Sequence, residues 1–295
     1  MAATATLSAS ASARRSSLMR YFRHPGFLIG VILLTLLLIV AVAAPWIAPM
    51  SPLETDLANT LAPPSAAHLL GTDQFGRDVL SRLIWGTRIS LQVAVAVMAL
   101  SLSLGMVIGA VAGFFGGWVE RVTVSIIDIL LAFPGFLLAL ALVAARGSSL
   151  ESVIIAVALA FTPRVAAVMR AVVLTIKPRT YVEASRAIGM GTMRLLFLHV
   201  VPNSLPPVIV VATVSAATAI LAEAGLSFLG LGVQPPAPTW GNVIADGQSF
   251  LASNPLISLS AGICIAVMVV ALNLLGDGLR DTLDPQMRRS SGRVL

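Results

Sequence analysis

The sequence predicts an all-α membrane protein whose chain crosses the bilayer six times. Hydrophobic residues make up 57% of the 295 residues and charged residues only 11%, against roughly a quarter charged in a soluble domain. The mean hydropathy is +0.94. The apolar residues are gathered into stretches of about 20 residues or more, which is the length an α-helix needs to cross the hydrocarbon core.

Charged or proline-rich segments separate the apolar stretches. The predicted spans are Phe27–Pro49, Ile89–Trp118, Val122–Ala145, a segment from Glu151 past Arg164, one inside Leu195–Ala222 and one inside Gly247–Gly276. Pro134 predicts a kink in the third span. An arginine at mid-bilayer costs about 3 kcal/mol, so the fourth span is expected to bring Arg164 near the inner face and to continue into water toward Arg170.

The distribution of positive charge predicts the orientation, because cytoplasmic segments of membrane proteins are enriched in Lys and Arg. The inner segments carry Arg14, Arg15, Arg20, Arg23, Arg121, Arg164, Arg170, Lys177, Arg179, Arg186, Arg194, Arg280, Arg288, Arg289 and Arg293. The outer segments keep Arg77, Arg82, Arg88 and Arg146. Both termini are therefore expected in the cytoplasm.

The chain divides into four predicted regions. Residues 1–20 are poor in large apolar side chains and are expected to be a disordered cytoplasmic N-terminus. Residues 21–88 hold the first span and an outer amphipathic segment, residues 89–285 form the core, and residues 286–295 are a cytoplasmic tail.

The sequence lacks the residue patterns that several classes of function require. The net charge of +6 is spread between apolar spans, which argues against nucleic acid. The single lysine, Lys177, precedes Pro178, so no phosphate-binding Gly-Lys-Ser/Thr loop is present. Three separated histidines and the lone Cys264 make a zinc site improbable. Neither a Gly-x-Ser-x-Gly elbow nor paired catalytic carboxylates occur. We expect a chain that is not an enzyme and binds no cofactor or metal.

The outer segment from Met50 to Arg88 begins proline-rich and ends with helical spacing. Its apolar residues predict one face of a helix, namely Phe75, Val79, Leu80, Leu83 and Ile84. Asp73 with Arg77, and Asp78 with Arg82, are spaced as i,i+4 ion pairs on the opposite face. A helix on the membrane surface and a docking element remain alternatives. The second outer segment, Glu223 to Pro255, has no Lys or Arg and is rich in Gly and Pro, which predicts a structured loop.

The inner segment from Lys177 to Asn203 predicts two short helices. Pro178 suits a helix start, and residues 181–188 form the first helix. Gly189 and Gly191 interrupt it, and Thr192 is placed to cap a second helix that ends before Pro202. We name residues 177–203 the elbow.

The elbow contains Glu183-Ala184-Ser185, then Gly189, then His199-Val200-Val201-Pro202. This pattern resembles the cytoplasmic "EAA" loop of ABC importer permeases, in which Glu-Ala-Ala, a glycine and an apolar-x-apolar-Pro ending follow at fixed spacing. Ser185 and His199 depart from it. The resemblance implies a coupling role for Glu183, Ala184, Gly189 and Pro202. Ser185 and Arg186, in the same predicted helix, are further coupling candidates. Independently, small residues permit close approach to a partner, and Glu183 and Arg186 offer charges that fix its register.

Further stretches resemble the dipeptide, oligopeptide and nickel permeases, in the order of that family. They are the runs 71–82, 131–135, 226–232 with 235–236 and 240–241, and 273–281 with 284–285. The likeness extends from about Phe22 to Pro285 and is to the second, C-type permease of such systems.

The resemblance implies a type I ABC importer permease fold with a cytoplasmic coupling helix, in a bacterial-type inner membrane. It also implies the partners: a second homologous permease, two ABC ATPases that bind ATP and Mg²⁺, and an extracytoplasmic substrate-binding protein. The expected cargo is a peptide of the dipeptide or oligopeptide class, although glutathione-like peptides and nickel complexes pass through permeases of the same appearance.

Three carboxylates are candidates for the translocation path. Asp128 lies inside the third span, where an ionisable residue indicates function by default; solvation or pairing with Arg121 is the alternative. Glu223 and Asp246 lie near the outer mouth, with a solvated loop as the alternative. The main rival function is a self-sufficient secondary transporter or channel, which needs paired intramembrane charges of its own.

Overall fold

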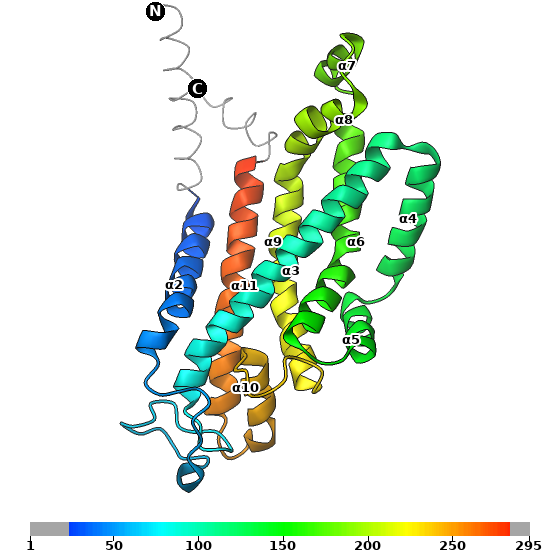
Figure 1. The fold of residues 1–295 in the computed structure, drawn as a ribbon. Coiled ribbons are helices and arrows are strands. Elements are labelled where there is room, and N and C mark those ends of the chain that lie inside the picture. Colours follow the sequence, from blue (N-terminus) through cyan, green and yellow to red (C-terminus); the bar gives the residue numbers. More distant parts are fainter. Residues whose placement is uncertain (1–23, 284–295) are drawn as a thin grey trace, which may run out of the picture.

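The structure is a computed structural model that describes residues 24–283. The predicted disordered N-terminus and the predicted tail after residue 285 lie outside the described residues. The described part is a bundle of long helices with short elements at both ends (Figure 1). We call the end that carries α7 the inner end and the end that carries α10 the outer end, following the orientation predicted from the positive charges.

The described residues contain helices and no named strand, which confirms the all-α prediction. The helices in chain order are α2 (Pro25–Ile47), η1 (Leu57–Asn59), α3 (Val79–Phe115), α4 (Gly117–Ala132), α5 (Gly135–Arg146), α6 (Leu150–Ile176), α7 (Thr180–Ala187), α8 (Thr192–Leu195), η2 (Leu196–Val200), α9 (Val201–Phe228), α10 (Trp240–Gly247), η3 (Gln248–Phe250) and α11 (Leu256–Leu283). Within residues 24–283, five continuous helices are long and apolar enough to cross a membrane, and the bent pair α4–α5 makes six.

Helix α2 begins at a capped proline turn. His24 precedes Pro25, and its Nδ1 accepts a hydrogen bond from the Phe27 backbone N–H at 3.3 Å. The same ring pairs with Asp281 of α11 at 3.0 Å. Helix α2 packs along α11 and α3 at one side of the bundle (Figure 1).

Helix α3 starts ten residues earlier than the predicted second span. Asp78 caps it by accepting from the Ser81 N–H at 2.8 Å, and the helix continues unbroken to Phe115. The prediction of a separate amphipathic outer helix is therefore wrong, because its apolar positions Val79 and Leu83 are buried in the first turns of a span.

The most extensive helix packing joins α3 to α6. Gly105, Gly109 and Gly113 recur every fourth residue on α3 and face Val165, Ala166 and their neighbours on α6. A Cβ on Gly109 would lie 2.3 Å from the carbonyl oxygen of Ala166. Small residues at this spacing let two membrane helices approach until their backbones touch.

The third span is a broken helix. Helix α4 ends at Ala132 and α5 begins at Gly135, turned by 91°. A kink was predicted at Pro134, but the chain turns by a right angle, since Phe133 is extended and α5 packs across the outer half of α6. The predicted single third span is corrected to this pair.

Helix α6 covers the fourth span and settles its boundaries. Ser149 caps it by accepting from the Ser152 N–H at 3.0 Å, and the helix runs without interruption to Ile176. Arg164 lies mid-helix, and the helix continues past it toward Arg170, six residues nearer the inner end, as predicted. Pro163 precedes it inside the helix.

The fifth span is longer than predicted at both ends. Residues Thr192–Phe228 form one continuous 37-residue helix through α8, the single π-helical turn η2 and α9. Pro202 sits in the first turn of α9, so the prediction that the second elbow helix ends before Pro202 is wrong. Gly191 is the N-cap of α8, without a side-chain hydrogen bond, so the predicted cap by Thr192 is wrong.

The outer end closes with α10 and the start of α11. The sixth span, α11, begins at Leu256, inside the predicted Gly247–Gly276 stretch, because Gly247–Pro255 complete α10 and a short 3₁₀ turn; it continues to Leu283, beyond the predicted end. Trp240 of α10 is fully buried, and its Nε1 donates to the Leu83 carbonyl of α3 at 3.1 Å. This contact fixes the outer segment on the bundle.

Candidate functional site

The inner elbow is built around α7. Glu183, Ala184, Arg186 and Gly189 are exposed, whereas Val182 is fully buried. The helix ends in a left-handed turn at Gly189, where φ is +85°, and the Met190 N–H donates to the Ser185 carbonyl at 3.1 Å. Glycine is the residue that adopts this conformation without strain. The predicted first short helix is thereby confirmed within one residue at each end.

The elbow is anchored to three spans by one apolar cluster. Val182, Leu195 and Val200 pack with Phe114 of α3 and Val173 of α6. The Tyr181 and His199 rings lie 6.4 Å apart, joining α7 to the π-helical turn. A force applied to α7 therefore reaches α3, α6 and α9 through packed side chains rather than through a flexible loop.

The exposed surface of the elbow carries apolar as well as charged side chains. Ile188 is 82% exposed and Phe197 is 65% exposed, and Met193 and Leu198 are exposed beside them. Pro202 and the carboxylate of Glu183 are also exposed. Apolar side chains gathered at a polar end of a membrane protein mark an interaction surface.

At the outer end, four charged side chains form what we name the outer charge network: Asp73, Arg77, Arg82 and Asp246. The Asp73 carboxylate accepts from Arg77 Nε at 2.7 Å and from Arg82 at 2.6 Å. Asp246 accepts from Arg77 at 3.0 Å and from Arg82 at 2.9 Å. The network pairs two acidic with two basic side chains, so each group has partners of opposite sign although it is largely shielded from water.

The network joins segments that are far apart in the chain. Asp73 and Arg77 lie in the loop before α3, Arg82 lies in its first turn, and Asp246 lies on α10. Gly76 makes the loop possible, because its φ is +71° and a Cβ there would overlap the Asp56 carbonyl. The predicted Asp73–Arg77 pair is confirmed, but in a loop. The predicted Asp78–Arg82 pair is wrong: Asp78 caps α3 and contacts His68 at 3.1 Å.

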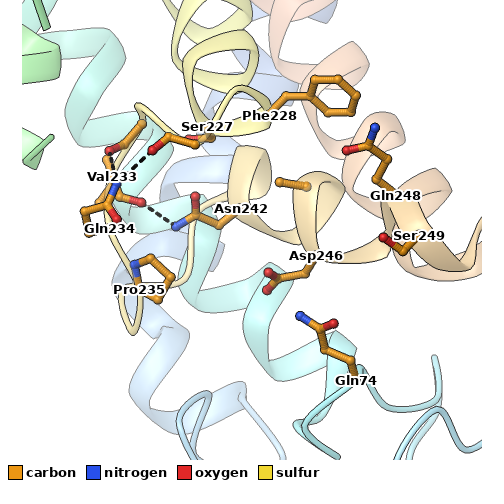
Figure 2. A pocket seen from close by; sticks show the side chains of 13 residues that line it. Gln74, Ser227, Phe228, Val233, Gln234, Pro235, Asn242, Asp246, Gln248 and Ser249 are labelled. Carbon is orange, nitrogen blue, oxygen red and sulfur yellow. Dashed lines mark hydrogen bonds between the residues drawn. The ribbon is translucent and has the colours of Figure 1, made fainter. Parts of the chain in front are cut away.

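A cavity of about 290 Å³ opens beside this network. Figure 2 shows Asp246 and Gln74 facing each other at one side of it. Its polar lining consists of Gln74, Gln234, Asn242, Asp246, Gln248 and Ser249, together with Ser227 at the end of α9. Asn242 shapes the wall by donating to the Val233 carbonyl at 2.7 Å (Figure 2).

The structure places the three candidate path carboxylates differently. Asp246 lines the outer cavity while bonded to both arginines. Glu223 belongs to α9 and not to a solvated loop; it is 1% exposed, Ser227 donates to its Oε1 at 2.9 Å, and its Oε2 is buried without a partner in residues 24–283. Asp128 is exposed on α4 and makes no pair with Arg121. The three do not form one cluster.

Sequence reasoning missed the partners of Asp246. Arg77 and Arg82 were assigned to the helix surface, although both are nearly buried. Their position was the signal that could have found them. Outer segments of membrane proteins carry few arginines, so an arginine there calls for a specific partner. Asn242 and Gln74 gave no signal, because their place at the cavity depends on how α10 packs beside the loop before α3.

Comparison with known proteins agrees with this architecture. Chains of the MetNI methionine ABC transporter, solved in inward-facing conformations, share the fold: one has a TM-score of 0.57 at 18% identity, covering 69% of this chain and 97% of its own. A second crystal form gives 0.57 at 19% identity, covering 68% and 96%. The fold class is that of a multi-pass type I ABC importer permease.

The family follows from sequence matches. Residues 105–289 match the model of binding-protein-dependent transport system inner membrane components, and residues 12–64 match the N-terminal TM domain of oligopeptide transport permease C. The chain belongs to the family of binding-protein-dependent transport system inner membrane components. It is a multi-pass inner membrane protein, as predicted.

Named relatives are similar over most of their length. The dipeptide transport system permease protein DppC of Alkalihalophilus pseudofirmus is 42% identical, covering 88% of this chain and 86% of that protein. The di/tripeptide transport system permease protein DppC of Pseudomonas aeruginosa is 42% identical, covering 92% and 91%. The glutathione transport system permease protein GsiD of Escherichia coli is 38% identical, covering 91% and 89%.

Proposed function

We propose that this chain is one of two permeases that form the membrane path of an ATP-driven importer of short peptides. Its partners are a second, homologous permease, two ABC ATPases and an extracytoplasmic binding protein. The chain itself catalyses no reaction and binds no cofactor, since ATP and Mg²⁺ are held by the ATPases. Both of its termini lie in the cytoplasm.

The observation that carries the proposal is the exposed, firmly anchored elbow. Helix α7 presents Glu183, Ala184 and Arg186 outward, while Val182 ties its other side to the inner ends of α3, α6 and α9. We infer that α7 seats in a groove of one ATPase. Ala184 permits close approach, and the two charges fix the register.

The remaining coupling residues keep the elbow in shape. The Ser185 hydroxyl donates to the Tyr181 carbonyl at 2.8 Å and so points back into its own helix. Gly189 supplies the left-handed turn, and Pro202 stands where the π-helical turn passes into the span. When the ATPases close on ATP, this rigid elbow moves as one body and carries the inner helix ends with it.

The names of the relatives support a peptide cargo. Dipeptide, di/tripeptide and glutathione permeases all move small molecules that contain peptide bonds and carry charged ends. The outer cavity, lined by amide side chains and one carboxylate, suits a polar molecule or a polar surface of the binding protein.

Two measurements test the proposal. The tagged chain is purified in mild detergent, and the proteins that accompany it are identified by mass spectrometry; a second permease and ATPase subunits are expected. The assembled importer is then placed in liposomes with its binding protein, and ATP-dependent uptake of trialanine is measured.

The elbow is tested by Glu183→Lys in that assay. Reversing the charge at the docking surface is expected to lower ATP-dependent uptake about tenfold, since close charge pairs at interfaces contribute several kcal/mol. Glu54→Lys, an equally exposed charge change at the outer end, is the matched control and is expected to retain uptake. Unchanged uptake with Glu183→Lys contradicts the coupling role. A chain that is recovered alone and still transports is a self-sufficient transporter instead.

A further inference from the structure

In the middle third of two spans, one charged side chain each lacks a partner among the described residues. Asp128 of α4 and Arg164 of α6 are both exposed, and neither makes a hydrogen bond or an ion pair within residues 24–283. A bare charge facing hydrocarbon is strongly unfavourable, so such groups face water, another protein or a ligand. Glu223, by contrast, is enclosed and bonded to Ser227.

The two charges lie at similar depth. Glu120 and Arg170 join the inner ends of α4 and α6, with Arg170 Nε donating to the carboxylate at 2.9 Å. From this pair α4 and α6 run side by side in opposite chain directions (Figure 1). At 1.5 Å per residue, Asp128 lies about 12 Å outward of Glu120, and Arg164 about 9 Å outward of Arg170.

They also point to the same side. Each residue turns the helix by about 100°, so Asp128 lies about 80° around α4 from Glu120, and Arg164 lies about 120° around α6 from Arg170 in the opposite sense. Because Glu120 and Arg170 face each other, these turns carry both side chains onto one side of the α4–α6 pair. The burial pattern agrees: Val165, Met169 and Val173, on the far side of α6, are fully buried.

The surface around Arg164 differs from a lipid-facing one. Ala167, Ala171 and Thr175 accompany it on the open face of α6 and are exposed or half-buried. Helix α2, at the edge of the bundle, instead exposes Leu36, Ile39 and Val42. Small side chains indicate a face that meets another helix or lines a water-filled space.

We propose that Asp128 and Arg164 line the translocation path and bind the two charged ends of a short peptide during passage. The Arg164 guanidinium binds the C-terminal carboxylate by paired N–H donors, and the Asp128 carboxylate binds the N-terminal ammonium. Neighbouring helix axes lie about 8–10 Å apart, and the ends of an extended di- or tripeptide lie about 7–11 Å apart. The proposal rests on the function proposed above and narrows it to zwitterionic peptides with free ends.

The test uses the complete importer in liposomes and radiolabelled trialanine. Arg164→Gln and Asp128→Asn are each expected to lower ATP-dependent uptake about tenfold, while Arg164→Lys and Asp128→Glu keep it within about threefold, because the charge is retained. Arg121→Gln removes a positive charge from the inner end of α4 and is the matched control, expected to retain uptake. Co-purification of each variant with its partners verifies that it folds and assembles.

A blocked peptide separates recognition from structure. With the C-terminal amide of trialanine, wild type and Arg164→Gln are expected to show the same low uptake. Trialanine uptake that survives Arg164→Gln overturns the proposal and means that the side chain reaches the inner surface instead. Equal losses with Lys and Gln, or wild-type uptake of the amide as fast as of trialanine, overturn it too. If the wild-type importer takes up no peptide, the proposed function itself fails.

Discussion

Asp73 is the most heavily bonded carboxylate of the outer charge network. One oxygen accepts from the backbone N–H groups of Phe75 and Arg77, and the other accepts from the guanidinium groups of Arg77 and Arg82. The side chain is 1% exposed. Removing one member of such a buried set leaves charges without compensation, which costs about 3–5 kcal/mol.

Asp73→Asn should therefore weaken the fold at the outer end. The asparagine retains the shape but loses the charge and one acceptor facing two arginines. We expect the unfolding temperature in detergent to fall on the order of 5–10 °C, measured with a thiol-reactive or light-scattering probe.

The control for this change is Glu54→Gln. Glu54 is an exposed carboxylate in the same outer segment, so its neutralisation is expected to shift the transition by no more than about 1–2 °C. Equal stability of Asp73→Asn and wild type would show that the network contributes little.

At the level of single residues, local spacing predicted only part of this network. Asp73 and Arg77 are four apart, and their pairing follows from that spacing. Arg77 and Asp246 are 169 residues apart in the chain and meet only because Trp240 holds α10 against α3. Contacts of this kind depend on tertiary packing, which residue spacing in a single sequence does not predict.

Among the helices, the glycines of α3 make the most specific prediction. A Cβ at Gly109 would lie 2.3 Å from the Ala166 oxygen and 2.7 Å from the Met169 Cβ. Gly109→Leu should push α3 from α6, cost about 1–3 kcal/mol or more, and lower the yield of monodisperse protein in size-exclusion chromatography. Val107→Leu, on an exposed position two residues away, should behave as wild type. A normal yield of monodisperse Gly109→Leu protein would contradict this prediction and would mean that α3 and α6 tolerate a wider spacing.

The helices show where hydropathy succeeds and where it stops. Every predicted span corresponds to a helix or a bent pair, since lipid requires long apolar segments with satisfied backbones. The ends were displaced, because hydropathy measures side chains and not the helical hydrogen bonds that carry α3 and α9 beyond the apolar region. The 91° turn at Pro134 depends on the packing of α5 against α6 and not on proline alone.

For the whole molecule, the orientation is open to a direct test. In a Cys264→Ser background, Gln248→Cys places a thiol at the outer end and Thr180→Cys places one at the elbow; both positions are exposed. A membrane-impermeant maleimide should label Gln248→Cys in intact spheroplasts and Thr180→Cys only after permeabilisation. The reverse pattern would invert the topology and remove the elbow from the ATPases.

The motif in the elbow predicts the family from the order and spacing of its residues, and the similarity to known permeases confirms that family. The candidate site was less accessible. Glu183 and Gly189 are recognisable by pattern, whereas the relation between Asp128 and Arg164 depends on how α4 and α6 lie against each other. Hydropathy even treated Arg164 as a boundary, because an arginine within a span is read as the end of the membrane.

The uninterrupted helix from Thr192 to Phe228 has a mechanical consequence. At 37 residues it is about 55 Å long, with the elbow at one end and Ser227 and Phe228 of the outer cavity at the other. Two helices joined by a flexible loop would transmit a movement along the helix axis but not a rotation about it. A continuous helix passes on both, so a rotation imposed at the elbow end is carried to the cavity wall at the outer end. The π-helical turn at Leu196–Val200 is an irregular point along this helix, next to the elbow end.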